Sequence, residues 1–128
     1  MAAKNILVVP TDFSERSLTA LAWVRKMAEA MQADIRCIYV VEEPQIYSTL
    51  DMGPVAIPSV TELVKSAEEH LDAFIKANIK AFGSAPKASV LVGRPAEEIV
   101  SYARDNDATM IVMTTHGYSG VKHLLLGS

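Results

Sequence analysis

Small residues near the end of the chain have the spacing of a loop that could hold an anion. Nine residues separate Gly117 from Gly127 and Ser128, and Thr114 stands three positions before Gly117. Glycine allows a backbone to approach a ligand closely, and amide groups at the start of a helix bind phosphate. An apolar run precedes this segment, and Gly127 with Ser128 could open a helix. The spacing indicates a phosphate-binding loop, although glycines in this arrangement also form plain turns, and both interpretations stay open.

Asp12 is the second candidate, because it follows the first apolar run of the chain. An aspartate here can cap the next helix, with Glu15 reaching back from three residues further on. It can equally contact a ligand at the end of a strand. The sequence leaves both roles open.

Other reactive residue types give a weaker signal. His116 stands beside a glycine, which favours a solvated turn, and no cysteine or carboxylate completes a zinc set with His123. His70 lies among acidic residues and is predicted on the surface. Cys37 lies inside an apolar run, which favours a buried structural thiol. No nucleophile elbow, carboxylate pair or catalytic triad is apparent, so the sequence does not indicate a dedicated enzyme.

Composition and charge limit the classes of protein to which the chain can belong. The 128 residues suffice for one domain, with 50% hydrophobic and 21% charged residues, as in ordinary globular proteins. A net charge of -3 and the lack of a Lys/Arg cluster argue against nucleic-acid binding. The first apolar run is too short for a signal peptide or a membrane span, so we expect a cytoplasmic protein.

Apolar runs alternate with helical patterns along the chain. Strands are predicted at 6–9, 35–41, 89–92 and 108–113, and helices at 18–31, 60–82 and 95–104, with a long loop near 44–59. Strands that alternate with helices predict an α/β fold with an open parallel sheet. Ligands bind such sheets outside the carboxyl ends of the strands, which here are followed by 10–14, 93–95 and 114–120 among other loops. The dinucleotide fingerprint and the P-loop motif are both absent.

Three segments together resemble the universal stress protein family. They are Val-Pro-Thr-Asp-Phe-Ser at 9–14, Val-Leu-Val-Gly-Arg-Pro at 90–95, and Thr-His-Gly at 115–117 with Leu-Leu-Leu-Gly-Ser at 124–128. The resemblance covers the whole chain as one domain, 1–128. It implies a Rossmann-like fold of the adenine nucleotide alpha hydrolase type, with strand order 3-2-1-4-5, and a homodimer.

The resemblance also implies a site for ATP or AMP, with or without Mg²⁺. One branch of the family binds ATP through the pattern G-x-x-G, nine residues, G-[ST], of which Gly117, Gly127 and Ser128 match here and Thr114 does not. The site residues it implies are Pro10, Thr11, Asp12, Val40, Met113, Thr114, Thr115, His116, Gly117, Tyr118, Ser119, Gly127 and Ser128. No catalytic residue and no protein-held metal are predicted. ATP hydrolysis, if any, is expected to be slow.

The chain departs from the family pattern at Thr114 and at its C-terminal end, and these departures leave two functional hypotheses. Thr114 either crowds a nucleotide or hydrogen-bonds to it. The family's last helix and fifth strand would follow Ser128, so we expect a C-terminally truncated domain whose strand at 108–113 is a free, self-associating edge. The leading hypothesis is a nucleotide-binding regulatory module of the stress response. The alternative is an interaction protein of the same fold that binds no nucleotide.

Overall fold

The computed structural model describes residues 5–42, 59–114 and 124–127. In chain order its elements are β1 (Asn5–Pro10), α1 (Glu15–Met31), β2 (Ala33–Val41), α3 (Val60–Ala77), α4 (Ile79–Phe82), β3 (Lys87–Val92), α5 (Pro95–Asp105), β4 (Met110–Thr114) and β5 (Leu124–Gly127). Every predicted strand is present within a few residues of its expected bounds. The alternation of apolar strands and amphipathic helices therefore produces the predicted α/β fold.

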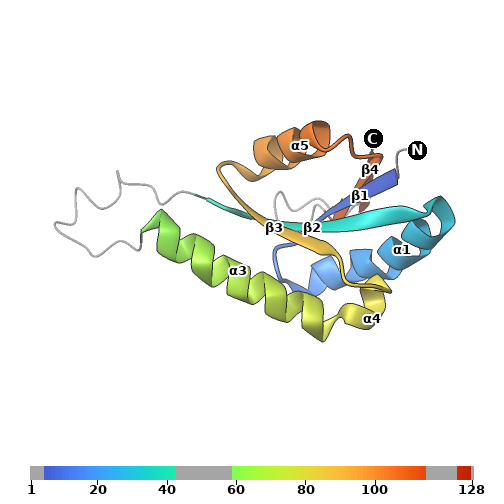
Figure 1. Cartoon of the computed structure of the whole chain (residues 1–128), viewed down its shortest axis with the longest axis horizontal. Helices are drawn as coiled ribbons and strands as arrows, with labels where there is room; N and C mark the ends of the chain where they lie inside the picture. The colour runs from blue at the N-terminus through green and yellow to red at the C-terminus, as the bar shows by residue number, and fades with distance from the viewer. Residues whose placement is uncertain (1–4, 43–58, 115–123, 128) are drawn as a thin grey trace.

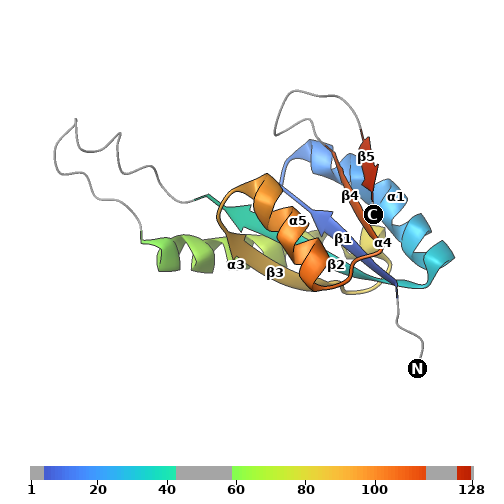
Figure 2. The same cartoon turned by 90° about the horizontal axis from the view of Figure 1, so that it is seen from above.

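The sheet has the order β3-β2-β1-β4-β5. Strands β3, β2, β1 and β4 run parallel, which confirms the predicted parallel sheet and the order 3-2-1-4. Each crossover between parallel strands contains at least one helix, as parallel pairing requires. The central strand β1 lies between β2 and β4, so the strand order reverses at the carboxyl end of β1 (Figure 2).

The edge beside β4 differs from the expectation. Strand β5 pairs antiparallel with β4, from Ile111 opposite Gly127 to Thr114 opposite Leu124. The prediction of a free edge is therefore wrong for 111–114, and a short antiparallel strand stands where a parallel fifth strand was expected beyond the chain. The physical reason is that an unpaired strand edge carries open amide and carbonyl groups, which a nearby apolar segment can satisfy.

Helices cover both faces of the sheet. Helices α1, α3 and α4 lie on one face and α5 lies on the other (Figure 1). We call these the packed face and the α5 face. Of the described helices, none is both long and apolar enough to cross a lipid bilayer.

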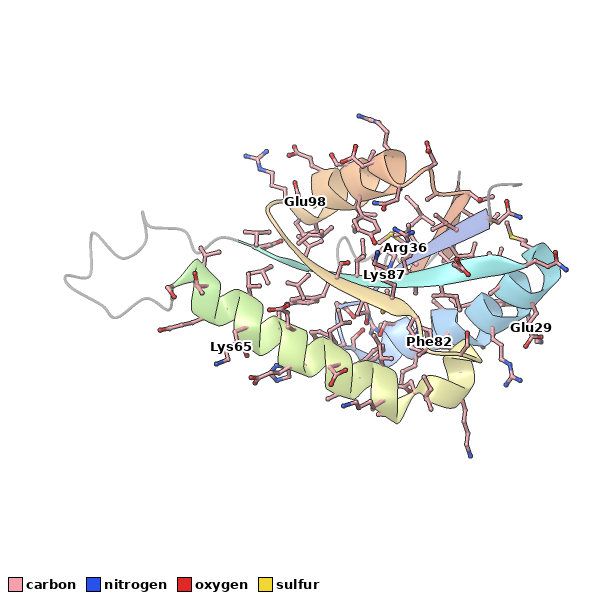
Figure 3. All side chains as sticks on the ribbon, viewed as in Figure 1. Glu29, Arg36, Lys65, Phe82, Lys87 and Glu98 are labelled. Atoms are coloured by element: carbon pink, nitrogen blue, oxygen red, sulfur yellow. The ribbon has the colours of Figure 1, made fainter. Side chains whose placement is uncertain are left out.

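The packed face contains the larger core. Its buried residues are Leu7, Val9, Ala20, Leu21, Val24, Ala28, Ile35, Cys37, Leu71, Ile75, Phe82 and Val112. Phe82, labelled in Figure 3, is 2% exposed in this core. On the α5 face the buried cluster is Val8, Ile38, Val40 and Ile99. Successive residues of a strand point to opposite faces, so β1 and β2 contribute to both cores in alternation.

The helix predicted at 60–82 is interrupted. Asn78 donates its side-chain amide to the carbonyl of Phe74 at 2.8 Å, and its backbone N–H also bonds the Phe74 carbonyl, at 3.1 Å. The Phe74 carbonyl thus accepts the Asn78 side chain in addition to the regular helical N–H, and the Asn78 backbone leaves the helical conformation at φ -119° and ψ 22°. Helix α3 therefore ends at Ala77, and α4 begins at Ile79. Gly83, at φ 82°, then ends α4 in a conformation that favours glycine. The prediction of one continuous helix is wrong at this point.

Candidate functional site

The segment after β1 is held by a buried hydrogen-bond network. Thr11 is 3% exposed, and its backbone N–H donates to the carbonyl of Ile38 at 2.9 Å. Its hydroxyl donates to the Ser17 hydroxyl at 3.1 Å and accepts from the N–H of Phe13 at 3.1 Å. The bond to Ile38 fixes the segment after β1 to β2, and the bond to Ser17 fixes it to α1.

Ser14, rather than Asp12, caps helix α1. The Ser14 hydroxyl oxygen accepts from the backbone N–H of Ser17 at 3.3 Å, and the helix begins at Glu15. Asp12 lies two residues earlier, where its Oδ1 accepts from the backbone N–H of Ser14 at 3.0 Å and from the Ser14 hydroxyl. Of the two roles that the sequence leaves open for Asp12, helix capping belongs instead to Ser14. The partly exposed carboxylate of Asp12 orients the true cap and remains a candidate ligand contact at the carboxyl edge of the sheet.

Phe13 has a left-handed backbone with φ 66°. A bulky residue rarely adopts this conformation, and such strain costs on the order of 1–3 kcal/mol. Its ring stacks on Tyr39 with centroids 4.5 Å apart and meets the Phe74 ring edge-on at 5.7 Å. Each aromatic pair stabilises by about 0.5–1.5 kcal/mol beyond the area it buries. The two pairs are therefore of the right size to offset the strain.

Sequence reasoning missed this aromatic group. A useful signal was the spacing of His70 and Phe74, which lie one turn apart on α3 and both contact the Phe13 ring. His70 is exposed, as predicted, and its Nδ1 lies 2.8 Å from the carbonyl oxygen of Ser66. A carbonyl can only accept, so Nδ1 carries the proton and donates. His70 is thus a surface residue that also contacts the loop after β1.

Three apolar residues gather at the carboxyl edge on the α5 face. Val40 belongs to the buried cluster of that face and Met113 packs against it. Pro10 is buried and lies two residues after Val8, so strand alternation places it on the same face. The strands that carry them are neighbours, since β1 pairs with both β2 and β4. We call Pro10, Val40 and Met113 the apolar shelf.

The turn after β3 supports the shelf from the side. The N–H of Gly93 donates to the carbonyl of Val41 at 2.9 Å, which fixes the start of α5 against the end of β2. Gly93 has φ 145°, and a Cβ there would lie 2.9 Å from Cγ of Glu98. Glu98 projects from α5 beside this turn (Figure 3). Glycine is therefore required at 93 both by conformation and by space.

The structure brings together some of the predicted site residues. Pro10, Thr11, Asp12, Val40 and Met113 lie at the carboxyl ends of three adjacent strands. Thr114 ends β4, and Gly127 lies within β5 rather than at a helix start. The remaining predicted residues are outside the described part of the chain: Thr115, His116, Gly117, Tyr118, Ser119 and Ser128. The structure thus places five of the predicted residues at one edge of the sheet, and that they form a binding site stays a prediction.

The described residues were also compared with the arrangements that hold metals and activate thiols. Among residues 5–42, 59–114 and 124–127, no three His, Cys, Asp or Glu side chains meet in a metal-holding arrangement. Cys37 is fully buried in the packed face, and burial raises the pKa of its thiol to about 12. A thiol at that pKa stays protonated near neutral pH and is a poor nucleophile.

A groove between α1 and α4 lies toward the opposite end of the sheet. It is lined by Leu21, Ala22, Arg25, Lys26, Glu29, Lys80 and Ala81. Arg25 Nε bonds Glu29 at 3.0 Å, and its Nη1 donates to the Lys80 carbonyl at 3.2 Å. The guanidinium is already engaged, so this groove is a weaker candidate than the carboxyl edge.

Comparison with known proteins identifies relatives of this chain. Universal stress protein MJ0531 of Methanocaldococcus jannaschii is 32% identical over 122 residues, covering 95% of this chain and 71% of that protein. The structure of the universal stress protein from Archaeoglobus fulgidus in complex with dAMP has a TM-score of 0.62 at 21% identity, covering 94% of this chain and 87% of that one. A universal stress protein in complex with cAMP has a TM-score of 0.65 at 20% identity, covering 92% and 81%.

These likenesses agree with the sequence motifs and with the sheet order. The two solved structures share the fold with this chain. The sequence model of the Universal stress protein family matches residues 4–128, which include the segment after β1, the apolar shelf and the turn at Gly93. The chain therefore belongs to the universal stress protein family.

Proposed function

We propose that the chain is a regulatory module of the stress response that binds ATP or AMP at the carboxyl edge of its sheet. The observation that carries the proposal is the apolar shelf beside Asp12, at the point where the strand order reverses. Open α/β sheets bind ligands at this position. In the same proposal the protein is cytoplasmic, self-associating and at most a slow ATPase.

The chemistry of the edge fits an adenine nucleoside. The faces of an adenine ring are flat and largely apolar. The side chains of Pro10, Val40 and Met113, which would contact the ring, are also apolar. The carboxylate of Asp12 accepts hydrogen bonds, and ribose hydroxyls donate them. The phosphates would then extend toward Gly117 and toward Gly127 with Ser128, with or without Mg²⁺. The two related proteins solved with dAMP and with cAMP support a nucleotide of this class.

One observation favours an alternative function. Gly127 pairs with Ile111 inside β5, so its amide is not placed at the start of a helix, where phosphate binds best. Thr114 also replaces the first glycine of the ATP-binding pattern. The alternative is an interaction protein of the same fold that holds no nucleotide.

Two measurements separate these functions. The purified protein is denatured directly after isolation, and the released small molecules are identified by mass spectrometry. The nucleotide-free protein is then titrated with ATP and with AMP, with and without Mg²⁺, in a calorimeter. Binding of either nucleotide supports the proposal. No bound nucleotide and no heat of binding would leave the interaction protein as the function.

A matched pair of variants locates the site. Val40 and Val41 are neighbours on β2 with exposed fractions of 8% and 7%, and strand alternation points them to opposite faces. Val40→Phe fills the apolar shelf, and Val41→Phe adds the same bulk on the packed face. We expect overpacking to cost each variant about 1–3 kcal/mol of stability. Only Val40→Phe should weaken nucleotide binding, and equal affinities in the two variants would place the nucleotide elsewhere.

A further inference from the structure

We propose that Phe13 is a positioning residue, clamped by Tyr39 and Phe74, that holds Asp12 in place for the nucleotide. The inference rests on the proposed nucleotide site and adds residues that touch no ligand. We call Phe13, Tyr39 and Phe74 the aromatic clamp. Its members come from the segment after β1, from β2 and from α3.

Phe13 lies between two residues that are hydrogen-bonded to each other. Asp12 and Ser14 are joined by the bonds from the Ser14 N–H and hydroxyl to Asp12 Oδ1, and Phe13 is the residue that this turn encloses. Its φ of 66° is unfavourable for a bulky side chain in a free loop. The turn therefore needs a contact that holds the Phe13 ring, and the direction of the Asp12 carboxylate depends on that contact.

Tyr39 supplies the contact that holds the Phe13 ring. The two rings are stacked at 4.5 Å with an interplanar angle of 23°. Tyr39 directly precedes Val40, and Phe13 directly follows Asp12. Because adjacent residues are covalently linked, the stack on the packed face fixes the distance between Asp12 and Val40 at the edge of the sheet. These two are the polar and apolar contacts proposed for the nucleotide.

Phe74 holds the Phe13 ring from the side of α3. The rings meet at 5.7 Å with an interplanar angle of 60°. His70, one turn earlier on α3, contacts the same ring at 6.2 Å. Phe74 is partly buried and packs against the core of the packed face, away from the apolar shelf. In this proposal a change at Phe74 acts on the nucleotide through Phe13 and the turn that contains Asp12.

The test compares Phe74→Leu with Phe82→Leu. Both changes replace a phenylalanine of the packed face, with Phe82 inside the core and Phe74 partly buried against it. Phe82 lies on α4, and its ring is not among those in contact with Phe13. The first readout needs no ligand: the hydrogen-exchange rate of the Ser14 amide, measured by NMR. We expect Phe74→Leu to accelerate this exchange roughly two- to tenfold beyond the effect of its altered global stability, as the loss of one aromatic pair predicts. Phe82→Leu should change the exchange rate only in line with global stability.

The second readout is affinity for ATP and AMP. Phe74→Leu should weaken binding roughly two- to tenfold. The same change should have no effect in an Asp12→Ala background, because the clamp acts through Asp12. Phe82→Leu should leave affinity unchanged in both backgrounds.

The outcomes separate this proposal from the proposed function. If the wild-type protein binds no nucleotide, the function fails, and Ser14 exchange alone then decides whether the clamp holds the turn. Equal exchange in the two Phe→Leu variants, corrected for stability, would overturn the clamp. Accelerated exchange with unchanged affinity in a nucleotide-binding protein would overturn its role in positioning Asp12. An equal loss of affinity with and without Asp12 would also overturn it.

Discussion

The two faces of the sheet are built differently. On the packed face, α1, α3 and α4 cover a cluster of twelve buried residues. On the α5 face, α5 is the described helix that covers the sheet, over a cluster of four buried residues. Ile111 and Met113 on that face are only partly buried. The packed face therefore supplies most of the described hydrophobic core, and at the carboxyl edge of the α5 face Met113 is the partly exposed member of the apolar shelf, beside the buried Pro10 and Val40.

This difference fits the proposal that one short chain combines a stable core with a nucleotide site. Burial of apolar surface stabilises the fold, whereas a binding site needs apolar surface that stays open to a ligand. The segment after β1 joins the two. Thr11 and the aromatic clamp attach it to buried parts of the molecule, and the partly exposed Asp12 lies at the carboxyl edge beside the apolar shelf.

The largest expected effect comes from truncating the packed core. Leu71→Ala should lower the free energy of unfolding by about 3–5 kcal/mol, because the side chain is 1% exposed and its loss leaves a cavity. Ile99→Ala on the α5 face should cost only about 2–3 kcal/mol, because Ile99 belongs to the smaller cluster of four buried residues. Urea denaturation of both variants gives the comparison. If the Ile99 variant loses as much stability as the Leu71 variant, the two faces are equally well packed.

Cys37 offers a chemical probe of the packed face. Burial raises the pKa of its thiol from 9.0 to about 12, which favours the neutral thiol in the folded protein. At pH 8 alkylation by iodoacetamide should then be at least ~1000-fold slower in the folded protein than in urea, since each unit of pKa changes the thiolate fraction about tenfold. Above pH 9.0 the unfolded thiol loses its proton first, so the contribution of Cys37 to stability falls as the pH rises toward 12. Rapid labelling of the native protein at pH 8 would show that this face opens readily.

The smallest expected effect comes from the helix caps, one at the site and one away from it. Ser14 caps α1 beside Asp12, and Ser59 caps α3, where its hydroxyl oxygen accepts from the N–H of Glu62 at 3.1 Å. Each change to alanine should cost about 1 kcal/mol in a thermal melt. Only Ser14→Ala removes a partner of Asp12, so only that variant should also weaken binding of ATP or AMP. Equal affinities would show that the Asp12–Ser14 contact serves the helix alone.

Local sequence patterns predicted the elements well because strands and helices have different hydrophobic periods. The apolar runs become β1, β2, β3 and β4, and their alternation with helices predicts the parallel pairing that is observed. The strand order was predicted from the family resemblance. The predictions fail where the sequence is compatible with two local structures. Asp12 and Ser14 are both good caps, and only the geometry of the turn selects Ser14. Asn78 is compatible with a helix, yet its amide bonds the Phe74 carbonyl and the helix is interrupted.

The sequence by itself determined the order of the elements, the parallel sheet and the motifs by which the family is recognised. These depend on neighbouring residues and on hydrophobic periodicity, which are visible along the chain. Only the tertiary structure decided that Phe13 meets Tyr39 and Phe74, that Pro10, Val40 and Met113 share one face, and that Leu124–Gly127 pairs beside β4. The physical reason is that these contacts join residues far apart in sequence, and strand pairing with helix packing brings them together.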